Sequence, residues 1–257
     1  MDNYEKFKGD VLRLTKIDLS AYKEKQMRRR IDSLVDKRQC KSYDEYVRLI
    51  SSKKDVFEEF VNFLTINVSE FYRNPDQGKL LVQTYAPELI ERFGKKLKIW
   101  SAACSTGDEP YSLVIALSEL IDINQITITA TDLDKQVIAQ AKTGLYSEKS
   151  IAGVPDAYKK KYFTKVGQSY QISDQIKRRV QFKQHNLLLD KYVTDYHLIV
   201  CRNVLIYFTE EAKHDVYVKF NKSLMKGGLL FIGSTEQVMD YKNIGYKRRS
   251  SFYYEKE

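Results

Sequence analysis

Apolar residues in the first quarter of the chain recur at spacings of three and four, the periodicity of an amphipathic helix. This pattern predicts helices over residues 4–15, 20–39, 42–52 and 54–64, with no strand pattern between them. Ser20 and Ser42 are candidate N-caps, because a serine hydroxyl accepts a hydrogen bond from the free N–H groups of a first helical turn. We therefore expect a small all-α domain over residues 1–72.

The pattern changes after a further helical run at residues 75–93. Short apolar or β-branched segments now alternate with helical ones, which predicts an α/β domain with a doubly wound, mostly parallel sheet over residues 73–257. We expect Gly227 and Gly228 to end the last long helix. The expected strands are residues 98–103, 126–131, 180–183, 197–201 and 229–233, and the helices are residues 108–121, 134–143 and 210–225.

Two segments depart from this alternation. Residues 246–254 alternate apolar and polar positions, which predicts a final strand or hairpin at the sheet edge. Residues 146–179 are polar and lysine-rich, with strand-like stretches on either side of a turn at Gly167. We interpret this region as an insertion with a small β-element, and a plain solvated loop is an equal alternative.

Composition narrows the class of protein. Hydrophobic residues at 43% and charged residues at 30% describe a globular chain without a membrane-spanning run or a signal peptide. Three cysteines without disulfide or metal spacing, and three scattered histidines, favour a cytoplasmic protein without a metal site. A net charge of +9 predicts attraction to an acidic partner: nucleic acid, an acidic protein surface or an anionic membrane.

The segment 98–112 is the most informative part of the chain. A short apolar run ends in small residues and Gly107, and then continues as an acidic helix start. A strand that turns tightly into a helix is typical of nucleotide-binding sheets, but the glycine-rich dinucleotide pattern is absent. Asp108 and Glu109 would repel a phosphate at this helix start. They suit a cationic, hydroxyl-rich ligand such as S-adenosylmethionine (SAM), which has a sulfonium, an ammonium and a ribose.

Polar residues also follow other predicted strands. Because ligands bind beyond the carboxyl ends of parallel strands, Asp132 is a candidate for ribose hydroxyls and Asn186 for an adenine edge. Asn203 and Tyr207 follow a buried strand, and Arg73 is a candidate partner for a carboxylate. Taken singly, each has an ordinary alternative as a helix start, a loop anchor or a packing residue.

Taken together and in this order, these segments resemble the CheR family of chemoreceptor glutamate O-methyltransferases. The resemblance covers almost the whole chain, including the helical N-terminal region. The matching segments are residues 67–73, 101–112, 130–134, 185–187 and 201–208.

The resemblance implies a SAM-dependent enzyme with a Rossmann-like domain that esterifies glutamate side chains on the cytoplasmic helices of chemotaxis receptors. It implies that Arg73 and Tyr207 lie nearest the catalysed step, as residues that position the reactants. S-adenosylhomocysteine (SAH) would be the second product. The residues implied to bind the cofactor are Asn67, Ser69, Arg73, Gly107, Glu109, Asp132, Asn186, Leu187, Asn203 and Val204.

The basic charge gains a candidate partner from this resemblance. On the helix after Ser20, apolar residues mark one face, whereas Lys25 and Arg29 point away from it, with Arg30 and Lys37 on a flank. We expect this surface to dock on an acidic receptor helix, and a solvated face with internal ion pairs is the alternative.

Some family members carry a three-stranded insertion that binds the receptor's C-terminal peptide. The hairpin near residues 165–171 is short here, so we expect recognition by the N-terminal helices alone. Two other functions stay open: a SAM-dependent RNA methyltransferase, although no RNA-binding motif is present, and a non-catalytic SAM-binding module. We expect no nucleic-acid partner, no insertion into a membrane and a monomeric protein.

Overall fold

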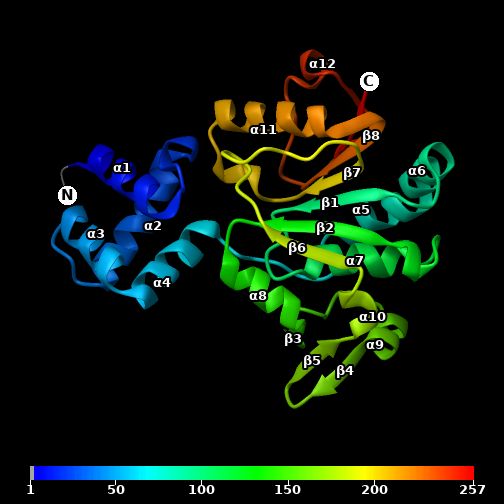
Figure 1. The fold of residues 1–257 in the computed structure, drawn as a ribbon, viewed down its shortest axis with the longest axis horizontal. Coiled ribbons are helices and arrows are strands. Elements are labelled where there is room, and N and C mark those ends of the chain that lie inside the picture. The colour runs from blue at the N-terminus through cyan, green and yellow to red at the C-terminus, as the bar shows by residue number, and fades with distance from the viewer. Residues whose placement is uncertain (1–2) are drawn as a thin grey trace. The chain divides into compact units, whose positions relative to one another are not determined.

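A computed structural model describes residues 3–257, which divide into two compact units. The helical unit comprises Met1–Asn67 together with Leu205–Lys213, and the sheet unit comprises Val68–Val204 and His214–Glu257. The chain therefore leaves the sheet unit after residue 204 and returns to it at residue 214. Figure 1 shows the elements of both units.

Amphipathic helices pack around a small aromatic core in the helical unit. Phe7 contacts Tyr43 and Phe60, with ring centroids 4.7 and 6.2 Å apart. Ser42 caps its helix as predicted, because its hydroxyl accepts from the Glu45 N–H at 3.2 Å. The elements are α1 (Tyr4–Thr15), the 3-10 turn η1 (Leu19–Ala21), α2 (Glu24–Lys37), α3 (Tyr43–Ser52) and α4 (Lys54–Thr65).

The start of α2 differs from the prediction. Ser20 is not its N-cap, because Asp18 caps the turn η1 by accepting from the Ser20 N–H, and α2 begins only after Lys23. The buried face of α2 is the predicted one, since Met27, Ile31, Leu34 and Val35 are its buried residues.

The segment that returns to the helical unit pairs with the chain between η1 and α2. Tyr22 and Phe208 form an antiparallel bridge, and their rings lie 4.9 Å apart. The Lys23 N–H donates to the Tyr207 carbonyl at 2.9 Å, and the Thr209 N–H donates to the Ala21 carbonyl at 2.9 Å. The end of the predicted motif 201–208 is therefore held by the N-terminal helices.

Seven strands form the sheet of the second unit, in the order β6-β2-β1-β7-β8-β10-β9. The first five are parallel and the last two antiparallel, so the predicted hairpin at the sheet edge is confirmed. The strands are β1 (Lys98–Ala102), β2 (Thr127–Asp132), β6 (Val180–Gln184), β7 (Tyr196–Cys201), β8 (Leu224–Ile232), β9 (Tyr246–Arg248) and β10 (Tyr253–Lys256).

The strand order reverses between β1 and β7. Helices α7 (Asp108–Leu117) and α8 (Lys135–Thr143) connect β1 through β2 to β6, whereas α11 (Glu210–Ser223) connects β7 to β8 in the opposite direction. Right-handed crossovers therefore place α11 on the other face of the sheet, as the doubly wound prediction requires (Figure 1). Ligands bind at such a reversal, beyond the carboxyl ends of the strands.

The predicted helix at residues 75–93 is continuous, although it changes pitch in the middle. It consists of α5 (Pro75–Leu80), a π-helical turn η2 (Leu81–Tyr85) and α6 (Ala86–Phe93). The Tyr253 hydroxyl donates to the Gln77 carbonyl at 2.9 Å, which attaches α5 to the strand β10.

One predicted helix end is wrong. Gly227 and Gly228 do not end α11, which stops at Ser223, but lie inside β8. A Cβ on Gly228 would lie 3.1 Å from the Tyr196 carbonyl oxygen and 3.2 Å from that of His197, so the close approach of β7 requires glycine here. The pairing of β7 with β8 shifts its register at this point.

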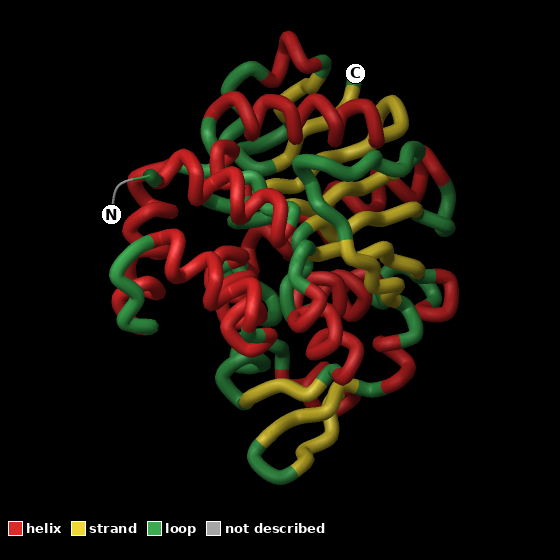
Figure 2. The backbone as a smooth tube through the Cα atoms, turned by 60° about the vertical axis from the view of Figure 1, so that its left-hand side comes forward, coloured by secondary structure: helices red, strands yellow, loops and turns green. Residues whose placement is uncertain are grey.

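The insertion forms a three-stranded antiparallel sheet of its own, in the order β3-β5-β4, so it is not a plain loop, and the expectation of a short hairpin in place of a three-stranded insertion is wrong. Gly167 makes the turn between β4 and β5 with a φ of 59°. Figure 2 shows this small sheet apart from the main one. Its elements are β3 (Leu145–Ser147), α9 (Asp156–Tyr162), β4 (Phe163–Val166) and β5 (Ser169–Ile172), and a short helix α10 (Asp174–Lys177) leads on to β6.

Candidate cofactor site at the strand ends

The turn after β1 has an unusual backbone. Ala103, Ser105 and Gly107 have positive φ angles of 62°, 48° and 89°. A Cβ on Gly107 would lie 2.9 Å from the Ala141 Cβ, so both its conformation and its packing require glycine. Two non-glycine residues in the left-handed region mark strain of the kind found at functional sites.

Asp132 at the end of β2 holds this turn in place. Its carboxylate accepts from the Ser105 N–H at 2.8 Å and from the Asp134 N–H at 3.0 Å. Burial raises the pKa of Asp132, and these two hydrogen bonds act against that rise. A carboxylate has about four lone-pair sites, so Asp132 remains able to accept from a ribose hydroxyl.

The two acidic residues at the start of α7 differ in their partners. Asp108 is buried and accepts from the Thr106 hydroxyl at 2.6 Å, and burial raises its pKa. Glu109 accepts from the Ser101 hydroxyl at 2.9 Å and lies 3.8 Å from the Arg202 guanidinium. Burial raises the pKa of Glu109, whereas the positive charge of Arg202 lowers it.

Arg73 lies between two residues with left-handed backbone. Tyr72 and Asn74 have φ angles of 54° and 56°. The Tyr72 N–H donates to the Ser112 hydroxyl at 3.1 Å, which joins this turn to α7. Arg73 Nη1 donates to the Val68 carbonyl at 3.5 Å, and the positive charge of Arg73 acts to lower the pKa of Glu109.

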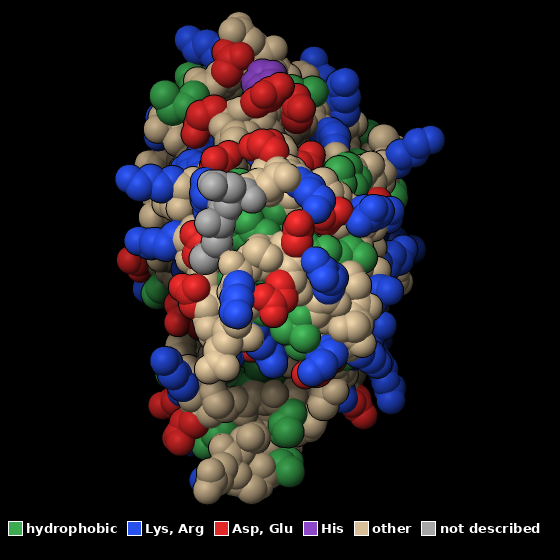
Figure 3. Space-filling model, turned by 90° about the vertical axis from the view of Figure 1, so that its left-hand side faces the viewer, with side chains coloured by type: hydrophobic (Ala, Val, Ile, Leu, Met, Phe, Trp, Pro, Cys, Tyr) green, Lys and Arg blue, Asp and Glu red, His purple; other side chains and the backbone are tan. Residues whose placement is uncertain are grey.

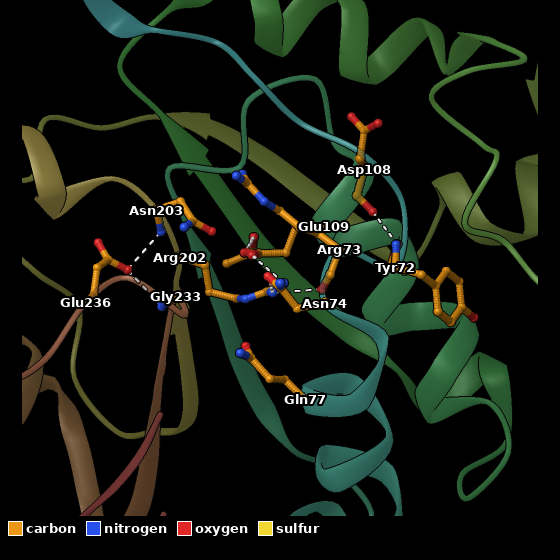
Figure 4. Close-up of polar contacts among 12 residues, drawn as sticks. Tyr72, Arg73, Asn74, Gln77, Asp108, Glu109, Arg202, Asn203, Gly233 and Glu236 are labelled. Carbon is orange, nitrogen blue, oxygen red and sulfur yellow. Dashed lines mark hydrogen bonds and ion pairs between the residues drawn. The ribbon is translucent and has the colours of Figure 1, made fainter. Parts of the chain in front are cut away.

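Arg202 links these groups, although the sequence patterns assigned it no specific role. Its guanidinium donates to the Arg73 carbonyl at 2.7 Å and to Asn74 Oδ1 at 2.9 Å (Figure 4). It also stacks on the Phe231 ring at 4.8 Å, and its side chain is only 8% exposed. The sequence does contain one indication of this role. An arginine directly after a core strand is expected to be buried, and a buried charge requires hydrogen-bond or ion-pair partners.

Asn203 and Val204 directly follow Arg202. Their N–H groups donate to the carboxylate of Glu236 at 2.8 and 3.1 Å. Glu236 is a second residue that the sequence did not single out. Glu236 follows β8, the strand beside β7, so its contact with Asn203 and Val204 depends on a strand pairing that the local sequence does not encode.

The predicted adenine residues follow β6. Asn186 Oδ1 accepts from the Leu188 N–H at 2.9 Å and the Leu189 N–H at 3.4 Å, so this amide closes a local turn. The Leu187 carbonyl accepts from the Tyr192 hydroxyl at 2.7 Å. Asn186 and Leu187 are each 8% exposed.

Two predicted site residues belong to the helical unit. Asn67 donates from Nδ2 to the Thr65 hydroxyl at 2.9 Å, and Tyr207 lies in the 3-10 turn η4 (Leu205–Tyr207). Ser69 belongs to the sheet unit, where a hydrogen bond from its side chain acts to lower the pKa of Asp108. The sheet unit thus brings Ser69, Arg73 and Glu109 to one end of the sheet.

The four predicted docking residues on α2 have different surroundings. Lys25 and Arg29 are exposed and form no ion pair with residues 3–257. Arg30 donates to the Phe63 carbonyl at 2.6 Å and stacks on the Phe63 ring, and Lys37 pairs with Glu59 at 2.6 Å. Figure 3 shows basic and acidic side chains mixed over the side of the molecule that it draws.

Two buried polar atoms test whether these residues fit SAM. Ser105 Oγ and Asn203 Oδ1 have no hydrogen-bond partner among residues 3–257. A buried polar atom without a partner is unfavourable, and a bound ligand with amino or hydroxyl groups would satisfy it. Together with the carboxylates of Glu109 and Asp132, these atoms fit a ligand with an ammonium group and ribose hydroxyls.

Two protein families match the chain along nearly its full length. The CheR methyltransferase SAM-binding domain matches residues 67–253, and the CheR methyltransferase all-alpha domain matches residues 2–65. Within residues 3–257, every helix is too short or too polar to span a bilayer.

Curated relatives agree with these matches. A chemotaxis protein methyltransferase of Listeria innocua is 39% identical over 93% of this chain and 91% of its own length. One of Borreliella burgdorferi is 31% identical over 90% of this chain and 86% of its own length. Among solved structures, a TehB-like SAM-dependent methyltransferase of Corynebacterium glutamicum is similar with a TM-score of 0.39 and 16% identity, over 70% of this chain and 96% of that one.

Proposed function

The chain belongs to the CheR methyltransferase family, and from this premise we propose that it methylates glutamate side chains on the cytoplasmic helices of chemotaxis receptors. It is a SAM-dependent methyltransferase, with SAH as its second product. The observation that carries the proposal is the group of acidic side chains and unsatisfied acceptors at the reversal between β1 and β7. Such a site suits a cationic cofactor without phosphate.

We assign the cofactor-binding residues by their chemistry. Arg73 takes the cofactor carboxylate, because a guanidinium forms two parallel hydrogen bonds with a carboxylate. Glu109 takes the ammonium and Asp132 the ribose hydroxyls. Asn67 and Ser69 contact the methionine part, and Gly107 admits the ligand close to the backbone. Asn186 and Leu187 lie at the adenine, and Asn203 and Val204 along the cofactor.

The reaction requires little acid or base chemistry from the protein. A glutamate carboxylate is already ionised near neutral pH, so no strong base has to activate it. When bound, the cofactor supplies an electrophilic methyl group on its sulfonium. The protein contributes proximity, alignment and exclusion of water. Arg73 and Tyr207 therefore act as positioning groups, with the Tyr207 hydroxyl close to the receptor carboxylate.

Substrate recognition belongs to α2 in this proposal. Lys25 and Arg29 are free to face an acidic receptor helix, and Arg30 and Lys37 complete the basic surface from its flank. The proposal places the enzyme in the cytoplasm as a monomer, without a nucleic-acid partner. The domain boundary proposed near residue 72 separates this docking function from methyl transfer.

Methyl transfer to a receptor fragment tests the proposal. The protein is incubated with SAM that carries a radioactive methyl group, together with purified cytoplasmic fragments of a chemotaxis receptor. We expect label on the fragment that mild base releases as methanol, because methyl esters hydrolyse and methylated amines do not. Base-stable label, label only on RNA added to a parallel reaction, or SAH binding without any transfer would each contradict the proposal.

A further inference from the structure

Glu236 lies in a tight turn directly after β8 and is only 8% exposed. Its carboxylate accepts three backbone hydrogen bonds. The Gly233 N–H donates to Oε2 at 2.7 Å and the Asn203 N–H donates to the same oxygen at 2.8 Å (Figure 4). The Val204 N–H donates to Oε1 at 3.1 Å. This side chain therefore joins the ends of two neighbouring strands.

The backbone at Asn203 requires such support. Asn203 has a φ of 59°, in the left-handed region that costs a non-glycine residue energy. The residues after a strand also lose the partners that the sheet supplied to their N–H groups. One ionised carboxylate replaces these partners for Asn203 and Val204 at once, and hydrogen bonds to a charged acceptor are stronger than neutral ones.

Gly233 restricts the same loop from the other side. A Cβ on Gly233 would lie 2.7 Å from the Asn203 nitrogen and 2.9 Å from its Cγ. The ends of β7 and β8 thus approach each other more closely than any residue other than glycine allows. The position of Asn203 is therefore set by the acceptor of Glu236 and by the close contact at Gly233, and the two meet at Glu236 Oε2, which also accepts from the Gly233 N–H and would lie 2.7 Å from a Cβ on Gly233.

The side chain held in this way is prepared for a ligand. Asn203 Nδ2 lies 3.4 Å from the Thr235 hydroxyl, whereas Oδ1 is buried without a partner among residues 3–257. A fixed, unsatisfied acceptor is unfavourable unless a ligand donor completes it. Binding of the cofactor therefore offsets the free-energy cost of holding the loop in this conformation.

We propose that Glu236 is a positioning residue for the cofactor, which holds Asn203 so that its Oδ1 accepts a hydrogen bond from bound SAM. This inference rests on the proposed role of Asn203 as a cofactor ligand. Glu236 acts on the cofactor through Asn203, because its carboxylate is directed at three backbone N–H groups. Its contribution is made through the conformation of residues 203 and 204.

Glu236→Gln tests this inference, because glutamine has nearly the same shape but replaces one carboxylate oxygen with an amide NH2 group. This group is a donor and cannot accept from a backbone N–H. We expect the Kd for SAH, measured by calorimetry, to rise about tenfold, the effect of one well-made hydrogen bond. The KM for the receptor fragment should stay within about twofold, because this arm of the site does not contact the receptor. The matched control is Glu148→Gln on the exposed insertion, which should leave the Kd for SAH unchanged.

A second pair of variants separates positioning from general loss of structure. Asn203→Gly removes the side chain without straining the left-handed backbone, and should itself raise the Kd for SAH. If Glu236 acts through Asn203, adding Glu236→Gln to Asn203→Gly will raise the Kd further by less than about twofold. Full multiplication of the two effects would overturn the inference, as would an unchanged Kd in folded Glu236→Gln.

Gly233→Ala provides the same test from the opposite side of the loop. Its Cβ would lie 2.7 Å from both the Asn203 nitrogen and Glu236 Oε2, so it separates this hydrogen-bonded pair while the glutamate itself is retained, and we expect a similar rise in the Kd for SAH. This variant also serves if Glu236→Gln fails to fold, and a wild-type Kd in it would contradict the inference. The SAH measurements need no receptor, so failure of receptor methylation would leave them readable and would contradict the proposed function alone.

Discussion

The Arg202 guanidinium donates a hydrogen bond to the backbone carbonyl of Arg73 at 2.7 Å, across 129 positions of sequence. The same guanidinium reaches Asn74 Oδ1 and the carboxylate of Glu109. The buried Arg202 side chain thereby fixes the turn that carries Arg73, the residue proposed to bind the cofactor carboxylate. Its positive charge also offsets the negative charge of Glu109, the residue proposed to bind the cofactor ammonium. The proposed cofactor site therefore depends on Arg202 at both residues that we assign to charged groups of the cofactor.

Replacing Arg202 with lysine should therefore weaken cofactor binding and folding together. Lysine retains the charge but cannot donate to two acceptors in one plane or stack on Phe231 in the same way. We expect a loss of about 2 kcal/mol in the free energy of unfolding and a Kd for SAH raised about tenfold. Urea unfolding and calorimetry measure the two effects. The exposed Arg178→Lys is the control, and equal behaviour of both variants would disprove the role of Arg202.

The role of Arg73 can be tested from the ligand side. Arg73→Ala should raise the Kd for SAH by roughly 30-fold, since a charge-assisted pair with a carboxylate contributes about 2 kcal/mol. An SAH analogue that lacks the carboxylate should bind wild type and Arg73→Ala with nearly the same Kd, because the interaction is then absent from both. Calorimetry with the four combinations completes the cycle. Equal losses for both ligands would show that Arg73 acts elsewhere.

Acidification should weaken cofactor binding at a higher pH than an exposed glutamate would. Burial raises the pKa of Glu109, so its carboxylate takes up a proton at a higher pH than an exposed glutamate does, as the pH falls through the raised pKa. Protonation removes the negative charge that the cofactor ammonium needs. We expect the Kd for SAH to rise with decreasing pH, starting above the pH range in which an exposed glutamate takes up its proton.

Glu109→Gln identifies the group responsible for this pH dependence. The variant should bind SAH more weakly near neutral pH and should lose the step that the raised pKa of Glu109 produces. Asp132 also has a pKa raised by burial, so a separate step from this carboxylate is expected to remain in the variant. Calorimetric titrations across the acidic range measure both curves. An unchanged step in Glu109→Gln would assign the pH dependence to another carboxylate.

Charge reversal on α2 tests receptor docking. The double variant Lys25→Glu and Arg29→Glu should raise the KM for receptor fragments by about tenfold, as expected for two exposed contacts of up to about 1 kcal/mol each. The Kd for SAH should remain constant. Lys53→Glu with Lys54→Glu, at the start of α4, is the matched control. The difference between the two double variants should shrink as salt is added, because ions screen exposed charges.

The regular elements of both units were predictable because they follow from local periodicity. Residues close together in the chain determine the apolar spacing of α1 and α3, the cap at Ser42 and the alternation of strands with helices. The errors at Ser20 and at Gly227 arose where a distant strand or a preceding turn overrides local preference. The hairpin of the insertion is visible in the local sequence, whereas the third strand, β3, is not, because it pairs with β5 from a distant part of the chain.

The candidate site was predictable in its residue types but not in its connections. Asp132, Glu109 and Asn203 are visible because polar residues follow buried strands. The roles of Arg202 and Glu236 depend on contacts with residues far away in the chain, which no spacing rule encodes. The same holds for Tyr207, whose carbonyl accepts from Lys23 in the helical unit.

Tyr207 permits the most specific test of the proposed chemistry. Tyr207→Phe keeps the ring and removes only the hydroxyl that we place beside the receptor carboxylate. The hydrogen bond from Lys23 ends on the Tyr207 carbonyl, so the substitution leaves the packing of the segment intact.

We expect kcat for receptor methylation to fall at least about tenfold, because misaligned reactants lose much of the advantage of proximity. The Kd for SAH should stay within about twofold. Phe208→Leu, which disturbs the contact with the Tyr22 ring instead, is the comparison. If Tyr207→Phe retains full kcat, the hydroxyl takes no part in alignment, and its proposed place beside the reacting carboxylate is wrong.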